Sequence, residues 1–144
     1  MYIYFCGSIR GGRDLAATYD KMITMLGTYG KVLTEHLGSN EEIEDRDRML
    51  SDNEIHDRDL QWIVESDLLV AEVTVPSLGV GYEIGRAIEM GKPVLCLFQS
   101  GLEYTISAMI SGSDGVEINY YQSFEEIKDL FDTFFSTHAP HRTS

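Results

Sequence analysis

Residues 68–90 of this chain read LLVAEVTVPSLGVGYEIGRAIEM, and this stretch decides its fold class. The first six residues are almost continuously apolar, which predicts a central strand buried on both faces of a parallel sheet. Pro76 and a glycine-rich loop follow, and residues 82–90 have the apolar spacing of a helix that Gly91 ends. A strand, a loop and a helix in this order form the repeating unit of α/β proteins.

The rest of the chain repeats this alternation of strands and helices. Further strands are predicted over residues 2–6, 31–34, 93–98 and 116–120, and further helices over residues 13–29, 54–66 and 106–110 and after a capping box of Ser123 and Glu126. The predicted fold class is α/β: a doubly wound, five-stranded, mainly parallel sheet with helices on both faces, of the Rossmann or flavodoxin type. Ligands of such folds bind beyond the carboxyl ends of the strands, so the loops after the first, third and fourth strands are the candidate site.

One domain is predicted over residues 1–137, since the chain is long enough for one hydrophobic core and no internal repeat is visible. Within it, residues 38–53 are rich in Asp and Glu and have few apolar anchors, which predicts an exposed and mobile acidic insertion. Residues 138–144 show no apolar periodicity and are predicted to form a disordered tail.

The composition limits the partners that the chain could have. Its 144 residues include 11 Lys and Arg against 24 Asp and Glu, a net charge of −13, which argues against nucleic-acid and anionic membrane partners. No apolar run is long enough to cross a bilayer, and no secretory signal is visible. Cys6 and Cys96 lie in apolar strand-like runs, so we expect buried free thiols in a reducing compartment. We therefore expect a cytoplasmic protein, and the sequence leaves a nuclear share open.

The loop after the first strand, Gly7-Ser8-Ile9-Arg10-Gly11-Gly12, is a candidate phosphate cradle. Its glycines allow a close approach of the backbone, Ser8 adds a hydroxyl, and Arg10 offers a planar cation that suits phosphate oxygens. The loop lacks both the Walker A motif and the G-x-G-x-x-G spacing of dinucleotide folds. The residues alone leave an ordinary glycine turn with a surface arginine equally open.

Two carboxylates are candidate catalytic groups. Glu83 falls in the first turn of the helix predicted over residues 82–90, where the helix dipole favours the ionised form that a nucleophile needs. Asp59 lies on the apolar face that Ile55, Trp62 and Ile63 define on its predicted helix, so burial should raise its pKa and make it a usable general acid. The alternatives are a Glu83 that only complements the dipole and an Asp59 that is satisfied by a backbone or arginine partner.

Metal and cofactor chemistry are not expected. The four histidines show no metal-ligand spacing and no H-E-x-x-H motif is present, so neither a metal nor another cofactor is predicted. No G-x-S-x-G elbow exists, and both cysteines are expected to be buried, which argues against serine or cysteine nucleophiles.

Six segments together resemble the 2′-deoxynucleoside 5′-monophosphate N-hydrolases of the nucleoside 2-deoxyribosyltransferase superfamily. They are YFCGSIRGGR (4–13), GKVLTEH (30–36), IHDRDLQW (55–62), VAEVTVPSLGVGYEIGRA (70–87), GKPVLCLF (91–98) and SAMISG (107–112). The resemblance covers most of residues 2–112 and is weaker in residues 38–53 and after residue 115. It implies the doubly wound fold and the hydrolysis of a deoxynucleoside monophosphate to a free base and 2-deoxyribose 5-phosphate.

The resemblance also implies a role for each matching residue. Glu83 would be the nucleophile that forms a glycosyl–enzyme intermediate, Asp59 would assist the leaving base, and Tyr4 would lie beside the sugar. The expected substrate-binding positions are the phosphate-site residues Ser8, Arg10, Ser77 and Gly79, the base-pocket residues Ile9, His36 and Ile55, and Gly11, Met109 and Ser107. Ser107 would reach the phosphate of the neighbouring subunit in a homodimer.

Several functions stay open at this stage. A deoxyribosyltransferase that passes the sugar between bases and a ribonucleotide N-glycosidase belong to the same superfamily. A nucleotide-binding module without catalysis is a different class, and a nicotinamide oxidoreductase is a weaker alternative. The acidic residues 38–53 directly follow the base-side segment of His36, so the preferred base is not predicted.

Overall fold

The computed structural model describes residues 1–8, 13–34, 47–138 and 140. Its elements, in chain order, are β1 (Tyr2–Gly7), α1 (Arg13–Leu26), β2 (Lys31–Val32), α3 (Asp52–Glu65), β3 (Leu68–Glu72), α4 (Leu78–Glu89), β4 (Val94–Gln99), α5 (Ala108–Ser111), β5 (Glu117–Tyr121), the 3₁₀ turn η2 (Phe124–Glu126) and α6 (Ile127–His138).

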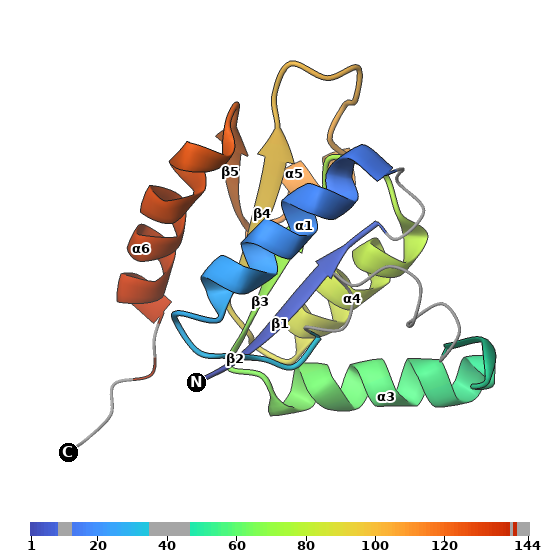
Figure 1. Cartoon of the computed structure of the whole chain (residues 1–144). Coiled ribbons are helices and arrows are strands. Elements are labelled where there is room, and N and C mark those ends of the chain that lie inside the picture. The colour runs from blue at the N-terminus through green and yellow to red at the C-terminus, as the bar shows by residue number, and fades with distance from the viewer. Residues whose placement is uncertain (9–12, 35–46, 139, 141–144) are drawn as a thin grey trace.

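The strands form one sheet in the order β2-β1-β3-β4-β5, and every pairing in it is parallel. The predicted fold class is confirmed, and the sheet is wholly rather than mainly parallel. Helices α1 and α6 cover one face, and α3 and α4 cover the other (Figure 1). The carboxyl ends of the strands therefore meet at one edge, where the loops after β1, β3 and β4 emerge.

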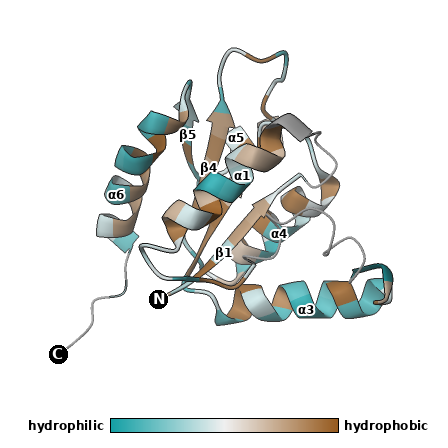
Figure 2. Ribbon diagram, in the orientation of Figure 1, coloured by the Kyte–Doolittle hydropathy of each residue, from teal (hydrophilic) through white to brown (hydrophobic). Residues whose placement is uncertain are grey.

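Alternation along the strands builds a separate core on each face of the sheet. Ile3 and Phe5 of β1 pack with Met22 of α1 and Phe131 of α6, whereas Tyr4 and Cys6 of β1 pack with the α3–α4 layer. The central strands are mostly apolar, and the helices carry their apolar residues on the sheet side (Figure 2). The free thiols Cys6 and Cys96 are both buried, as predicted.

Two helices begin earlier than predicted because their caps lie further upstream. The Ser77 hydroxyl accepts the Val80 N–H at 3.3 Å, so α4 begins at Leu78 instead of residue 82. Ser51 and Glu54 form a capping box that starts α3 at Asp52. The predicted acidic insertion is therefore too long by at least residues 52–53, which are helical, while residues 38–46 lie outside the described residues.

The end of α1 and the tail also differ from the prediction. Helix α1 ends at Leu26, and Gly30 is needed for another reason: a Cβ there would lie 2.6 Å from the backbone oxygen of Met1. His138 belongs to α6 and contacts Glu117, with 2.6 Å between Nε2 and Oε1, so the predicted tail cannot begin at residue 138. Residues 139 and 141–144 lie outside the described residues.

Candidate active site

Glu83 of α4 has the most unusual environment on the α3–α4 face of the sheet. Its Oε2 atom is buried and has no hydrogen-bond partner among the described residues. Burial, together with the negative charge of Asp59, raises the pKa of Glu83 from its ordinary value of 4.5 to about 7, although hydrogen bonds from Cys6 and Tyr4 oppose this rise. The carboxyl group can therefore exchange its proton near neutral pH, and one oxygen is free to bond to a substrate atom.

The prediction that Glu83 lies in the first helical turn and stays ionised to low pH is wrong. Because α4 begins at Leu78, Glu83 lies in the second turn, beyond the free amides at the helix N-terminus. Its pKa is set instead by burial and by neighbours from β1 and α3.

Tyr4 and Cys6 line the site from β1. They are two residues apart on the strand, so both point to the α3–α4 layer, and their exposed fractions are only 1% and 2%. Burial and the nearby charge of Glu83 raise the pKa of both groups above their ordinary values. Both therefore remain neutral donors toward Glu83 at physiological pH. Cys6 was not predicted as a neighbour of the site, although its spacing from Tyr4 was a usable signal.

Asp59 approaches Glu83 from α3 and is only partly buried, with 24% of its side chain exposed. Its Oδ1 lies 3.0 Å from Nε of Arg58. Arg58 also pairs with Asp47, at 2.8 Å between Nη1 and Oδ1, and lies over the ring of Trp62 at 4.8 Å. The arginine partner of the alternative interpretation of Asp59 is thus present, and the charge of Asp59 lies close enough to act on Glu83. Ile55 lies one turn before Asp59 on α3 and is partly buried.

A chain of hydrogen bonds links the two helices that carry the carboxylates. Tyr82, next to Glu83 on α4, accepts an N–H from Arg86 at 2.6 Å, and its hydroxyl lies 2.7 Å from Nε2 of His56 on α3. His56 Nδ1 lies 2.9 Å from Asp57 Oδ1. When His56 is neutral, these contacts fit a single direction of donation, from Arg86 through Tyr82 to His56 and then to Asp57. The chain ties α3 to α4 beside the site.

Two of the predicted phosphate-site serines follow the ends of neighbouring strands. Ser8 is buried directly after β1, and Ser77 caps α4 after β3. Gly79 is exposed in the first turn of α4, where a Cβ would meet only the Ser77 hydroxyl at 3.9 Å. A helix N-terminus with hydroxyls beside it is suited to an anion. The other predicted positions Ile9, Arg10, Gly11 and His36 lie outside the described residues.

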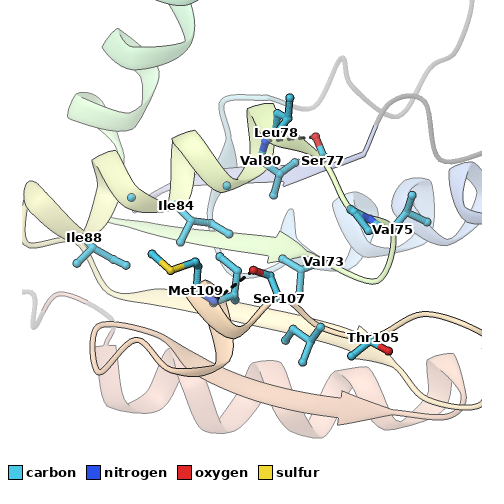
Figure 3. A pocket seen from close by; sticks show the side chains of 15 residues that line it. Val73, Val75, Ser77, Leu78, Val80, Ile84, Ile88, Thr105, Ser107 and Met109 are labelled. Carbon is cyan, nitrogen blue, oxygen red and sulfur yellow. Dashed lines mark hydrogen bonds between the residues drawn. The ribbon is translucent and has the colours of Figure 1, made fainter.

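The structure also contains an apolar groove of about 560 Å³ between α4 and the segment before β5. Ser77, Ser107 and Met109 lie along it, together with apolar side chains such as Val73 and Ile84 (Figure 3). Ser107 caps α5 by accepting the Met109 N–H at 3.2 Å. Neither Tyr4, Asp59 nor Glu83 is among the residues that line this groove.

Within residues 1–8, 13–34, 47–138 and 140, no three His, Cys, Asp or Glu side chains are placed to hold a metal ion. No helix in the same part of the chain is long and apolar enough to cross a membrane.

Comparison with known proteins gives matches over nearly the whole chain. Residues 3–129 match the family model described as nucleoside 2-deoxyribosyltransferase. A 5-hydroxymethyl-dUMP N-hydrolase of Rattus norvegicus is 46% identical over 99% of this chain and 89% of its own length. The enzyme of the same name from Tetraodon nigroviridis is 48% identical over 94% of this chain and 98% of its own length. A solved CMP N-glycosidase of Clostridium botulinum shares the fold, with a TM-score of 0.66 at 20% identity over 93% of this chain and 99% of that chain.

Proposed function

Because the chain belongs to the nucleoside 2-deoxyribosyltransferase family, we propose that it hydrolyses the N-glycosidic bond of 2′-deoxynucleoside 5′-monophosphates. The products are a free nucleobase and 2-deoxyribose 5-phosphate. The observation that carries this proposal is the buried Glu83 carboxylate, with its unpartnered oxygen, beside Tyr4, Cys6 and Asp59. The relatives named as 5-hydroxymethyl-dUMP N-hydrolases make that nucleotide the first substrate to test.

The proposed reaction uses the two carboxylates in two steps. In the proposed reactive form, the pair of carboxyl groups holds one proton, which lies on Asp59. Ionised Glu83 attacks C1′ of the sugar, the bond from C1′ to the base breaks, and Asp59 gives that proton to the departing base. Water then attacks C1′ of the glycosyl ester, Asp59 takes a proton from that water, and Glu83 leaves as a carboxylate. Positive charge develops on the sugar in both transition states, and an anion below C1′ stabilises it.

Tyr4 and Cys6 support Glu83 in this scheme. Hydrogen bonds from their neutral side chains lower the pKa of Glu83, so they favour the ionised form that attacks C1′. Without them, burial alone would leave a larger share of Glu83 protonated at neutral pH. Tyr4 is also the residue that we place beside the deoxyribose.

The 5′-phosphate is proposed to bind at the carboxyl edge of β1 and β3. Ser8 and Ser77 follow these two neighbouring strands, and the α4 N-terminus begins between Ser77 and Gly79. Arg10 is proposed to complete the site. The phosphate is remote from the bond that breaks, so its binding energy serves to orient C1′ over Glu83.

We further propose that the active unit is a homodimer, in which Ser107 and Met109 enter the site of the neighbouring subunit. The groove that contains them is apolar and open: Leu78 is 97% exposed and Met109 84% exposed. On α4, a Cβ at Gly81 or Gly85 would meet nothing within 4 Å, so this helix offers a flat surface for close contact with another chain. A second copy would cover these side chains.

The decisive test is a panel of deoxy- and ribonucleoside monophosphates and their nucleosides, with release of base and of sugar phosphate quantified by chromatography. We expect release from deoxynucleoside monophosphates, and a Glu83→Gln variant that still binds them but releases no base. Formation of a new nucleoside when a second base is added would instead identify a transferase. Release from ribonucleotides only would identify a ribonucleotide N-glycosidase, and binding without release a non-catalytic module.

A further inference from the structure

A second buried carboxylate, Glu72, lies outside the catalytic cluster. It is the last residue of β3, and its exposed fraction is 0%. It alternates with Leu69 and Ala71, which face the α3–α4 layer, so Glu72 points to the opposite face of the sheet, which α1 and α6 cover. None of the described ion pairs includes it, and burial raises its pKa above the ordinary value.

The carboxylate joins the carboxyl ends of three strands. One oxygen, Oε1, accepts the backbone N–H of Thr74 at 2.6 Å, and Oε2 accepts the hydroxyl of Tyr121 at the end of β5. The Thr74 hydroxyl in turn accepts the backbone N–H of Gln99, the last residue of β4, at 2.8 Å. The turn that leads from β3 to the Ser77 cap of α4 is therefore fixed at its base by Glu72.

The same residue lies beside the start of the β1 loop. Glu72 is paired in register with Gly7, and the ring of Tyr19 lies against Gly7 so closely that a Cβ there would be 2.9 Å from Cζ. Burial and the charge of Glu72 raise the pKa of Tyr19, and its hydroxyl is buried without a hydrogen-bond partner among the described residues. The Tyr19 ring thus packs on the residue that is paired with Glu72 in the sheet.

A carboxylate at this buried position lowers the stability of the fold. A buried charge without a cationic partner is costly, and an apolar side chain of similar volume would usually fill the space at a lower cost. What the carboxylate supplies is two acceptor atoms, one for the turn after β3 and one for β5. The turn that it holds leads to Ser77, and its paired residue Gly7 leads to Ser8; these are the two described serines of the proposed phosphate site.

We infer that Glu72 is a positioning residue for the phosphate end of the site: it holds the turn after β3, opposite its paired residue Gly7, at the distance from the Gly7–Ser8 step that a 5′-phosphate requires. This inference rests on the proposed function. It assigns no contact between Glu72 and the substrate, and the groups that bear on the phosphate are those on the two turns.

The experiment compares Glu72→Met, which keeps the volume but removes both acceptors, with Glu72→Gln, which keeps an acceptor for the Thr74 N–H. For Glu72→Met we expect a KM for a deoxynucleoside monophosphate raised about tenfold, with kcat changed less than about threefold, because small misplacements of binding groups have effects of this size or larger. Glu72→Gln should restore KM to within about threefold of the wild type. Residual hydrolysis of the unphosphorylated nucleoside should be the same in all three proteins.

Two further variants protect the test against misfolding. Tyr121→Phe removes a single hydroxyl from Oε2, and we expect a smaller rise in KM, about threefold, again for the monophosphate only. Glu89→Met makes the matched change at an exposed site on α4 and should leave all constants unchanged. Calorimetric titration of each protein with the product 2-deoxyribose 5-phosphate should show the same order of affinities without reference to turnover.

The outcomes separate this inference from the proposed function. If the wild type releases base but folded Glu72→Met and Tyr121→Phe keep its KM and its affinity for the sugar phosphate, the inference is overturned and the proposed function stands. Equal losses on the nucleoside and the monophosphate also overturn it, because they indicate a general structural role. A wild type that neither releases base nor binds the sugar phosphate overturns both.

Discussion

Replacing Glu83 with glutamine should make the protein more stable while it removes the proposed activity. Burial raises the pKa of Glu83 from 4.5 to about 7, so at pH 8 the folded protein holds a charge that the unfolded chain carries more easily. A pKa unit corresponds to about 1.36 kcal/mol, and the ionised carboxylate therefore lowers the free energy of unfolding by about 3 kcal/mol at pH 8. Glutamine, which cannot ionise, should recover most of this amount.

The sign of the effect fixes its pH dependence. Below the unfolded pKa of 4.5, Glu83 is protonated in both states and carries no penalty. The penalty grows as the pH rises through 4.5 toward 7 and is constant above that range, so the gain from glutamine should be about 3 kcal/mol at pH 8 and less than about 1 kcal/mol at pH 5. At roughly 2–4 °C per kcal/mol, the melting temperature at pH 8 should rise by several degrees.

Urea unfolding followed by circular dichroism at both pH values measures these differences. Glu89→Gln, an exposed change on the same helix, serves as the control and should show no difference at either pH. A Glu83→Gln protein no more stable than the wild type at pH 8, or equally stabilised at pH 5 and pH 8, would refute the account of Glu83 as a carboxylate destabilised by burial for the sake of its reactivity.

Further predictions concern activity. Since the reactive form holds one proton on the Glu83–Asp59 pair and that proton is lost with a pKa of about 7, kcat/KM of the wild type should fall about tenfold per pH unit well above pH 7, and this fall should be absent from the pH–rate profile of Asp59→Asn. Tyr4→Phe removes a hydrogen bond that lowers the pKa of Glu83, so it should move the fall in kcat/KM to higher pH. Unchanged pH–rate profiles in both variants would contradict the electrostatic coupling of Glu83 to Asp59 and Tyr4. Mixed dimers of Glu83→Ala and Ser107→Ala subunits should recover activity that neither homodimer has, and a fully active monomer in sedimentation experiments would exclude shared sites. Ser77→Ala should cost about 1 kcal/mol of stability through the lost helix cap, measured by urea unfolding, and should raise KM for the monophosphate more than for the nucleoside.

Most of the fold could be predicted because its strands carry their own signal. Continuous apolar runs predicted the central strands, and the alternation of strands and helices along the chain predicted their parallel arrangement. The start of α4 was missed because Gly79 and Gly81 are poor helix formers, and their low propensity hid a helix that Ser77 caps. Gly30 illustrates the opposite error, since a glycine that ends helices elsewhere is needed here for a close backbone contact.

The residues of the site could be predicted from the sequence better than their pKa values could. Resemblance to a known family supplied Tyr4, Asp59 and Glu83, and the structure brings all three together. The protonation state of Glu83 could not be predicted from its helix, because the groups that act on its carboxylate lie elsewhere: Tyr4 and Cys6 come nearly eighty residues earlier in the chain, and Asp59 lies on another helix. Local sequence describes only the helix around a carboxylate, whereas its pKa depends on every element packed against it.

The direction of the strands has a practical consequence for attaching the protein to other objects. The N-terminus lies at the amino edge of the sheet, where β1 begins, and α6 runs back from the carboxyl edge and ends near the same side (Figure 1). The proposed phosphate end of the site lies at the opposite edge. An affinity tag, a fused carrier domain or a bead joined at either end of the chain should therefore leave the substrate entrance uncovered. Immobilised preparations tethered in this way should turn over nucleotide as fast as the free protein.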